Sequence, residues 1–249
     1  MKEIKMEFYK GKRRHIWLSI IILIFAQMAW AIWASGKMDD HRLAQGWIYM
    51  MYQFPIINSI VMPILSAVIA SRICDTEHKG DTLKLMYTIT KPHKIFNAKL
   101  IYGGFYVITA VLLQVVAIIF AGKITGFKGS IPYMYYFYYG LFTAVVSLTI
   151  LLLHQILSLQ FKNQMISFAV GLFGAFLGLF SMFFPQRLQL LLLWGYYGVL
   201  MFVNMNWDRA TRIMDLYYTD INWSGFVLLI IMFLFLYLLG VELFKRKEM

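Results

Sequence analysis

Long hydrophobic runs dominate the chain and alternate with short polar segments. Six runs are long enough to cross a bilayer: 15–34, 48–71, 100–121, 132–159, 165–184 and 223–244. A helix needs roughly 20 apolar residues to span a hydrocarbon core about 30 Å thick. The runs lack the alternation of apolar and polar residues that membrane barrel strands show. We therefore predict an all-α integral membrane protein with six transmembrane helices in a single domain, 1–249, and expect the first helix to remain uncleaved.

A seventh apolar run, 188–203, is shorter and contains Gln189, Gly195 and Gly198. Its length and its glycines argue against a seventh span. We predict a re-entrant or interfacial segment on the outer side, which begins and ends on the same side of the membrane between spans five and six.

Composition agrees with a membrane protein, because 61% of the residues are hydrophobic and only 14% are charged, against about 25% charged in soluble domains. The predicted topology divides the Lys and Arg residues sixteen to seven. Cytoplasmic loops carry the excess of these residues, so we expect both termini in the cytoplasm. Most Trp residues and a Tyr-rich run then fall near the outer face. An interfacial aromatic belt explains them, and a surface that meets an amphipathic substrate is the alternative.

The sequence contains no motif for catalysis or metal binding. It has no G-x-x-x-x-G-K-[ST] phosphate loop, no H-E-x-x-H, no paired Cys/His spacing and no G-x-S-x-G. We therefore expect no enzyme activity and no metal or cofactor in this chain. The predicted spans also lack the central charged residues of an ion or proton relay. Energy for any uphill transport is expected from another chain.

Four polar residues inside the predicted spans are candidates for a substrate path: Gln27, Asn58, Gln114 and His154. Such side chains also form hydrogen bonds between helices in lipid. The sequence leaves both interpretations open, and His154 has the added capacity to titrate.

The polar segment between spans two and three has the pattern of a docking element. Asp75 or Thr76 is a suitable cap for a short helix, and Pro92 ends helix at or before Lys91. An apolar face follows from Leu83, Leu85, Met86 and Ile89. We predict a short coupling helix at the membrane surface, then a second short helix from His93 into span three.

This segment resembles the cytoplasmic loop of type-2 ABC exporter permeases. The matching residues are Glu77, Gly80, Thr82, Leu83, Leu85, Lys94, Ala98 and Lys99, and Asp81 departs from the pattern by separating Gly80 from Thr82. The basic segment before span one is also similar, at Glu7, Lys10, Lys12 and Arg13.

A narrower resemblance is to the permeases of lantibiotic-immunity transporters. It rests on residues 161–164, on residues 194–197 and on Gly171, Gly174 and Gly178, although close helix packing explains glycines at this spacing equally well.

The resemblance implies the partners and the site. The residues that would contact an ATP-binding subunit are Asp75, Glu77, Lys79, Gly80, Thr82, Leu83 and Lys84, with a second cytoplasmic contact at Phe161, Lys162 and Asn163. ATP and Mg²⁺ would bind to that subunit and not to this chain. A second permease chain, membrane lipid and a hydrophobic or amphipathic peptide complete the expected partners, in a bacterial plasma membrane.

Three other functions are weighed against this expectation. The main alternative is a membrane scaffold or sensor that docks a cytoplasmic partner. A membrane enzyme is disfavoured by the missing motifs. Nucleic acid is not expected as a partner, because the basic tails lie beside spans and suit anionic headgroups.

Overall fold

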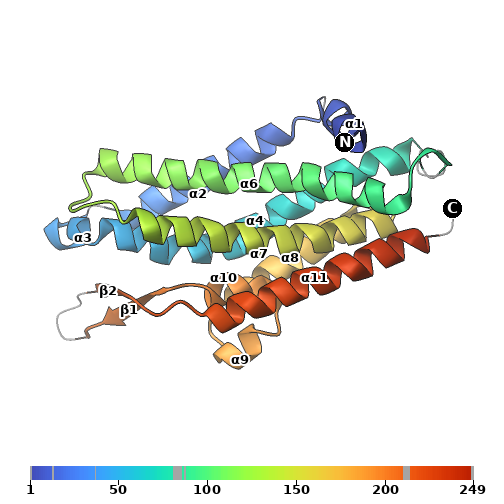
Figure 1. Ribbon diagram of the computed structural model, residues 1–249. Helices are drawn as coiled ribbons and strands as arrows, with labels where there is room; N and C mark the ends of the chain where they lie inside the picture. The colour runs from blue at the N-terminus through green and yellow to red at the C-terminus, as the bar shows by residue number, and fades with distance from the viewer. Residues whose placement is uncertain are drawn as a thin grey trace.

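The computed structural model describes residues 2–12, 14–36, 38–80, 86, 88–209 and 214–247. It is an elongated bundle whose long helices run roughly side by side (Figure 1). Both chain termini lie at one end of the bundle, which we call the terminal end. A β-hairpin marks the other end, which we call the hairpin end.

Helices make up nearly all of the regular structure. The long ones are α2 (Ile16–Ser35), α4 (Gly46–Lys79), α6 (Pro92–Thr125), α7 (Tyr133–Gln160), α8 (Met165–Ser181) and α11 (Trp223–Lys245). The short ones are α1 (Lys2–Gly11), α3 (Asp40–Ala44), α9 (Gln186–Gln189), η1 (Leu193–Gly195) and α10 (Tyr196–Val199). Two strands, β1 (Val203–Trp207) and β2 (Met214–Tyr218), form the antiparallel hairpin.

Five of these helices are long and apolar enough to cross a membrane: α2, α4, α6, α7 and α11. Helix α8 occupies the predicted fifth span but has only 17 residues, or about 25 Å at 1.5 Å per residue. The protein is thus a multi-pass helical membrane protein, and the count of six spans stays a prediction.

Helices α4 and α6 extend well past the predicted limits of spans two and three. Each has 34 residues and is therefore about 51 Å long. The helix of span two does not break before the predicted coupling helix: α4 continues through 72–79, which contains no Gly or Pro. The predicted second short helix is the first part of α6, which begins with Pro92 at a position where the missing N–H costs nothing.

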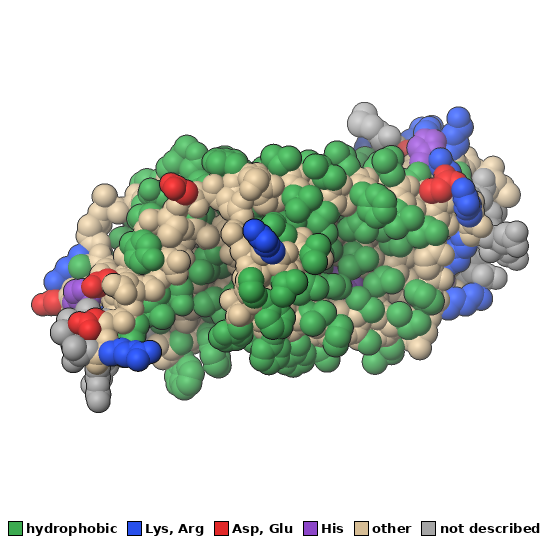
Figure 2. All heavy atoms as spheres, turned by 90° about the horizontal axis from the view of Figure 1, so that it is seen from below, with side chains coloured by type: hydrophobic (Ala, Val, Ile, Leu, Met, Phe, Trp, Pro, Cys, Tyr) green, Lys and Arg blue, Asp and Glu red, His purple; other side chains and the backbone are tan. Residues whose placement is uncertain are grey.

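Helix α4 is the centre of the bundle and contacts α2, α6, α7 and α8. Among its buried residues are Met50, Phe54, Leu65 and Ile69. It also contains Pro55 and Pro63 in its interior. The peripheral helices α2 and α11 instead expose apolar side chains. Figure 2 shows the resulting apolar surface over the middle of one face, with charged side chains mostly at the two ends.

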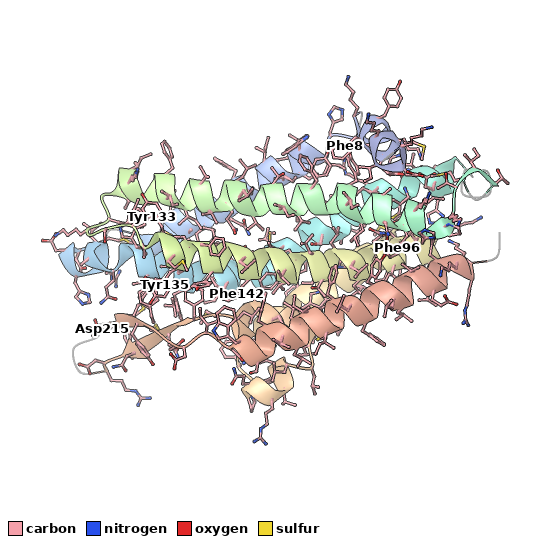
Figure 3. The ribbon with its side chains drawn as sticks, in the orientation of Figure 1. Phe8, Phe96, Tyr133, Tyr135, Phe142 and Asp215 are labelled. Atoms are coloured by element: carbon pink, nitrogen blue, oxygen red, sulfur yellow. The ribbon has the colours of Figure 1, made fainter. Side chains whose placement is uncertain are left out.

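The hairpin is an element that the sequence analysis did not predict. Its strands pair from Val203↔Tyr218 to Trp207↔Met214. The ring of Tyr218 stacks on that of Tyr135 from α7, with centroids 3.9 Å apart, at the hairpin end where Figure 3 labels Tyr135 and Asp215. The all-α prediction therefore holds for the bundle and is wrong for this outer ribbon.

The segment 188–203 does not form a continuous helix. It contains η1 and α10, which pack on α8, and Trp194 lies against the glycines of that helix. A Cβ atom at Gly174 would lie 2.1 Å from Trp194 Cε2, so only glycine admits the indole there. The segment is a set of short turns docked on α8, and its depth in the bilayer stays a prediction.

Candidate functional site

The predicted coupling segment begins inside α4. The helix continues without a break to Lys79, so Asp75 and Thr76 do not cap a new helix, and that expectation is wrong. Gly80 is the residue that ends α4, and its N–H donates to the Thr76 carbonyl oxygen. Residues 81–85, which include Thr82, Leu83 and Lys84, lie outside the described residues. Beyond them Met86, Thr88 and Ile89 are helical.

Glu77 points into the protein, where it joins a buried cluster of four charges. Its side chain is fully buried, and its Oε1 atom accepts hydrogen bonds from Lys99 Nζ at 3.0 Å and from Lys10 Nζ at 2.8 Å. Lys99 Nζ also lies 3.2 Å from both carboxylate oxygens of Glu7. We call Glu7, Lys10, Glu77 and Lys99 the ion-pair cluster.

The ion-pair cluster connects three helices at the terminal end. Glu7 and Lys10 belong to α1, Glu77 to the last turn of α4 and Lys99 to the first part of α6. Its two carboxylates balance its two ammonium groups, which offsets the cost of taking charges out of water. Lys99 makes one further bond, to the Ile73 carbonyl oxygen at 3.2 Å. Because the cluster joins the three helices, a displacement of the end of α4 also displaces side chains of α1 and α6.

Other predicted contact residues face solvent on the same turn of α4. Lys79 Nζ lies 2.8 Å from Asp75 Oδ2, and the two side chains are 78% and 23% exposed. These are the polar groups of this turn that a partner can reach, whereas the Glu77 side chain is buried beneath them.

The second predicted contact, in the turn between α7 and α8, lies beside the end of α4. His78 Nε2 of α4 is 2.8 Å from the Ser158 carbonyl oxygen of α7. Phe161 is 44% exposed, Lys162 is exposed, and Asn163 accepts a hydrogen bond from the Met165 N–H at 3.0 Å. The structure thus places the end of α4 and the turn with Phe161, Lys162 and Asn163 beside each other at the terminal end.

Three of the four candidate path residues form one buried polar network. Gln27 Nε2 donates to Asn58 Oδ1 at 2.9 Å, and Gln114 Nε2 donates to Gln27 Oε1 at 2.8 Å. Tyr139 completes the network by donating to Gln114 Oε1 at 2.6 Å and accepting from Asn58 Nδ2 at 2.8 Å. All four residues are at most 3% exposed. The network joins α2, α4, α6 and α7 and satisfies its own polar atoms.

His154 lies apart from this network, about 22 Å further along α7 than Tyr139. Its Nδ1 atom is 3.1 Å from Ser167 Oγ on α8. Its Nε2 atom is buried and has no hydrogen-bond partner among the described residues. A Cβ atom at Gly171 would lie 3.2 Å from the imidazole. The glycine therefore lets α8 approach α7 closely at this point.

No site for a metal ion is found in the described part of the chain, where no three His, Cys, Asp or Glu residues are suitably grouped. Cys74 is buried and free. The described residues offer two polar features: an ion-pair cluster that joins helices at the terminal end, and a hydrogen-bonded network that joins helices deeper in the bundle.

The features described so far define the class: a multi-pass helical membrane protein whose charged side chains lie mostly at its two ends (Figure 2). A family model described as ABC-2 family transporter protein matches residues 3–178. The chain therefore belongs to the ABC-2 transporter family, and it is a membrane component of an ABC transporter whose ATPase activity belongs to a separate subunit. No curated protein matches the chain at the threshold of the search.

Proposed function

We propose that this chain is the membrane subunit of an ATP-driven exporter and that the ion-pair cluster couples it to the ATP-binding subunit. The observation that carries this proposal is the position of Glu77. It lies on the turn of α4 that also presents Asp75 and Lys79 to solvent, yet its carboxylate holds Lys10 and Lys99. A partner that contacts the solvent-exposed side of this turn is therefore linked, through Glu77, to α1 and α6.

The mechanism follows from the rigidity of these parts. The ATP-binding subunit docks on the α4 end and on the neighbouring turn that contains Phe161, Lys162 and Asn163. Its closure on ATP and Mg²⁺ displaces the α4 end, and the cluster transmits the displacement to α1 and α6. Such a two-state bundle is biased by a ligand bound to another chain. Two permease chains would form the path between them, with both termini in the cytoplasm of a bacterial cell.

The proposed cargo is a membrane-active peptide, such as the lantibiotic against which a producing cell protects itself. This rests on the resemblance at residues 161–164 and at the glycines of α8. An apolar groove of about 330 Å³ between α4 and α8 adds support, since its lining includes Ile64, Ala67 and Phe168. A groove of this kind suits an apolar side chain that arrives from the bilayer.

Replacement of Glu77 by Gln tests the coupling. The variant and the wild type would be co-expressed with the ATP-binding subunit, reconstituted in liposomes and assayed for ATP hydrolysis and for export of a labelled lantibiotic. We expect Glu77→Gln to assemble and hydrolyse ATP but to export at least about tenfold more slowly. This corresponds to an increase of about 1.4 kcal/mol in the activation free energy of export.

The matched control is Glu242→Gln, which removes an exposed carboxylate on α11 at the same end. We expect it to export like the wild type. Wild-type export by Glu77→Gln would overturn the coupling role. Purification without an ATP-binding partner near one-to-one stoichiometry would favour the scaffold or sensor instead.

A further inference from the structure

A cavity of about 350 Å³ opens at the terminal end, where α1 meets the start of α2 and the side of α6. It is separate from the ion-pair cluster and from the predicted docking surface. Its lining combines aromatic, aliphatic and basic side chains: Phe8, Lys12, His15, Trp17, Leu18 and Tyr106.

The floor of the cavity is aromatic. Phe8 packs edge-on against Tyr102, with centroids 4.7 Å apart, and Trp17 packs against Tyr106 at 5.1 Å. Phe8 and Trp17 each remain 40% exposed. Figure 3 shows Phe8 where α1 lies over α6. These aromatic side chains thus form a partly exposed apolar surface, which continues into the apolar surface of α2.

The rim of the cavity is positively charged. Lys12 and His15 are exposed there. Next to them, the guanidinium groups of Arg14 and Arg72 each donate to the backbone carbonyl oxygen of the other residue. Among the described residues, no carboxylate forms an ion pair with Lys12, Arg14 or Arg72, whereas Lys10 and Lys99 are both paired in the cluster. Within the described ranges, the positive charge of this rim is therefore not compensated by an ion pair.

The backbone at His15 creates the cavity. This residue has φ of 50° and is the only residue other than glycine with positive φ in the described part of the chain. Helix α1 ends at Gly11, and the left-handed His15 stands directly before the first residue of α2, so that Lys12 and Trp17 line the same space. Strained backbone of this kind persists only where the surrounding structure holds it, and it concentrates at binding sites.

We propose that this cavity binds one anionic phospholipid, with its phosphate at Lys12 and His15 and an acyl chain along Phe8, Trp17 and Leu18. The combination of an uncompensated basic rim with an apolar floor is complementary to an anionic headgroup joined to a hydrocarbon chain. Basic groups beside a span attract anionic lipid by about 1 kcal/mol each. A lipid at this place would bridge α1 to α2 and support the helix that contributes Glu7 and Lys10. The proposal does not depend on the nature of the cargo.

Trp17 provides a probe inside the cavity. The other six tryptophans lie in the last turns of α2, the first turns of α4 and α11, η1 or the hairpin. The difference in fluorescence between the wild type and Trp17→Phe therefore reports on this site. The full chain would be reconstituted in phosphatidylcholine with increasing amounts of a brominated lipid, either phosphatidylglycerol or phosphatidylcholine with the same acyl chains.

We expect brominated phosphatidylglycerol to quench the Trp17 signal at an about tenfold lower mole fraction than brominated phosphatidylcholine. The variant Lys12→Gln, His15→Asn should lose this preference, and Asn tolerates the left-handed conformation. The control Lys2→Gln, Lys5→Gln removes two exposed lysines of α1 outside the cavity and should keep it. In each variant background, the signal is again the difference made by Trp17→Phe.

Three results would overturn the proposal. The first is equal quenching by the two lipids. The second is equal loss of preference in the control variant, which would reveal diffuse attraction to the surface. The third is displacement of the lipid by millimolar glycerol phosphate, which would show that the cavity is a site for a soluble phosphate.

Discussion

The carboxylate of Glu77 and the ammonium group of Lys99 lie 3.0 Å apart, and both side chains are completely buried. The two residues come from different long helices, and Glu7 of α1 shares the same ammonium group at 3.2 Å. Charges at this depth are stabilised by one another. Removal of one weakens the charge balance of those that remain in a place that is largely shielded from water.

Lys99→Met is expected to destabilise the protein strongly, by about 3–5 kcal/mol, because it removes the fully buried counter-charge that the carboxylates of Glu7 and Glu77 share. Lys79→Met is the matched control, since it breaks an exposed ion pair with Asp75 and should cost at most about 1 kcal/mol. Thermal unfolding of both purified variants in one detergent measures the difference. Equal melting temperatures would contradict the structural role of the cluster.

Asn58→Leu should destabilise the bundle by about 1–3 kcal/mol, because Gln27, Gln114 and Tyr139 lose partners in a buried site. Thr125→Val serves as the comparison, because Thr125 is exposed and its hydroxyl donates to Ala121 of its own helix, and it should change stability by less than about 0.5 kcal/mol. Thermal unfolding in detergent measures the change in stability of both variants. Altered cargo selectivity at unchanged stability would instead support the prediction that these residues line a substrate path.

Gly174→Ala is expected to displace Trp194, because the added methyl group would overlap the indole. Overpacking of this kind costs about 1–3 kcal/mol. Gly140→Ala is the control, since its nearest neighbour would be Val115 Cγ2 at an ordinary 3.5 Å, and alanine favours helix by about 1 kcal/mol. The two variants should shift the melting temperature in opposite directions. A stabilised Gly174→Ala would contradict the docking of segment 188–203 on α8.

Gln45→Ala should loosen the hairpin. The side chain of Gln45 donates to Asp215 Oδ1 at 3.0 Å and accepts from the Leu216 N–H at 2.9 Å. Loss of two hydrogen bonds, at about 1 kcal/mol each, should speed amide exchange at Leu216 by at least about tenfold. Asn206→Ala on β1, which is exposed, should leave that rate unchanged. Hydrogen exchange followed by mass spectrometry gives both rates.

The long helices could be predicted from the sequence because apolar runs of span length have few other stable forms. Their ends could not be predicted as well. The charges after Ser71 suggest the end of a span, yet Asp75 and Lys79 support one another across a helical turn, so α4 continues to Gly80. The charge pattern therefore predicts the position of the membrane surface, and it does not predict the end of the helix.

The sites were predicted in part. Glu77, Gln27, Asn58 and Gln114 could be identified as unusual polar residues. That Glu77 shares Lys99 with Glu7, and that Asn58 bonds to Tyr139, could not be predicted, because nothing in a single sequence links residues that are 70 or more positions apart. The hairpin had a local signal that the analysis overlooked: residues 203–207 alternate between apolar and polar side chains, which is the period of a half-buried strand.

The length of α4 has a consequence for how force crosses the membrane. Glu77 lies near one end, Gln45 holds the hairpin at the other, and Pro63 sits at the midpoint of the helix. Proline removes a backbone hydrogen bond and allows a helix to bend. A bend at Pro63 lets the two halves of α4 move separately. A bend of about 10° there shifts an end about 25 Å away by about 4 Å, so a push at the Glu77 end is taken up in part at Pro63 before it reaches the hairpin.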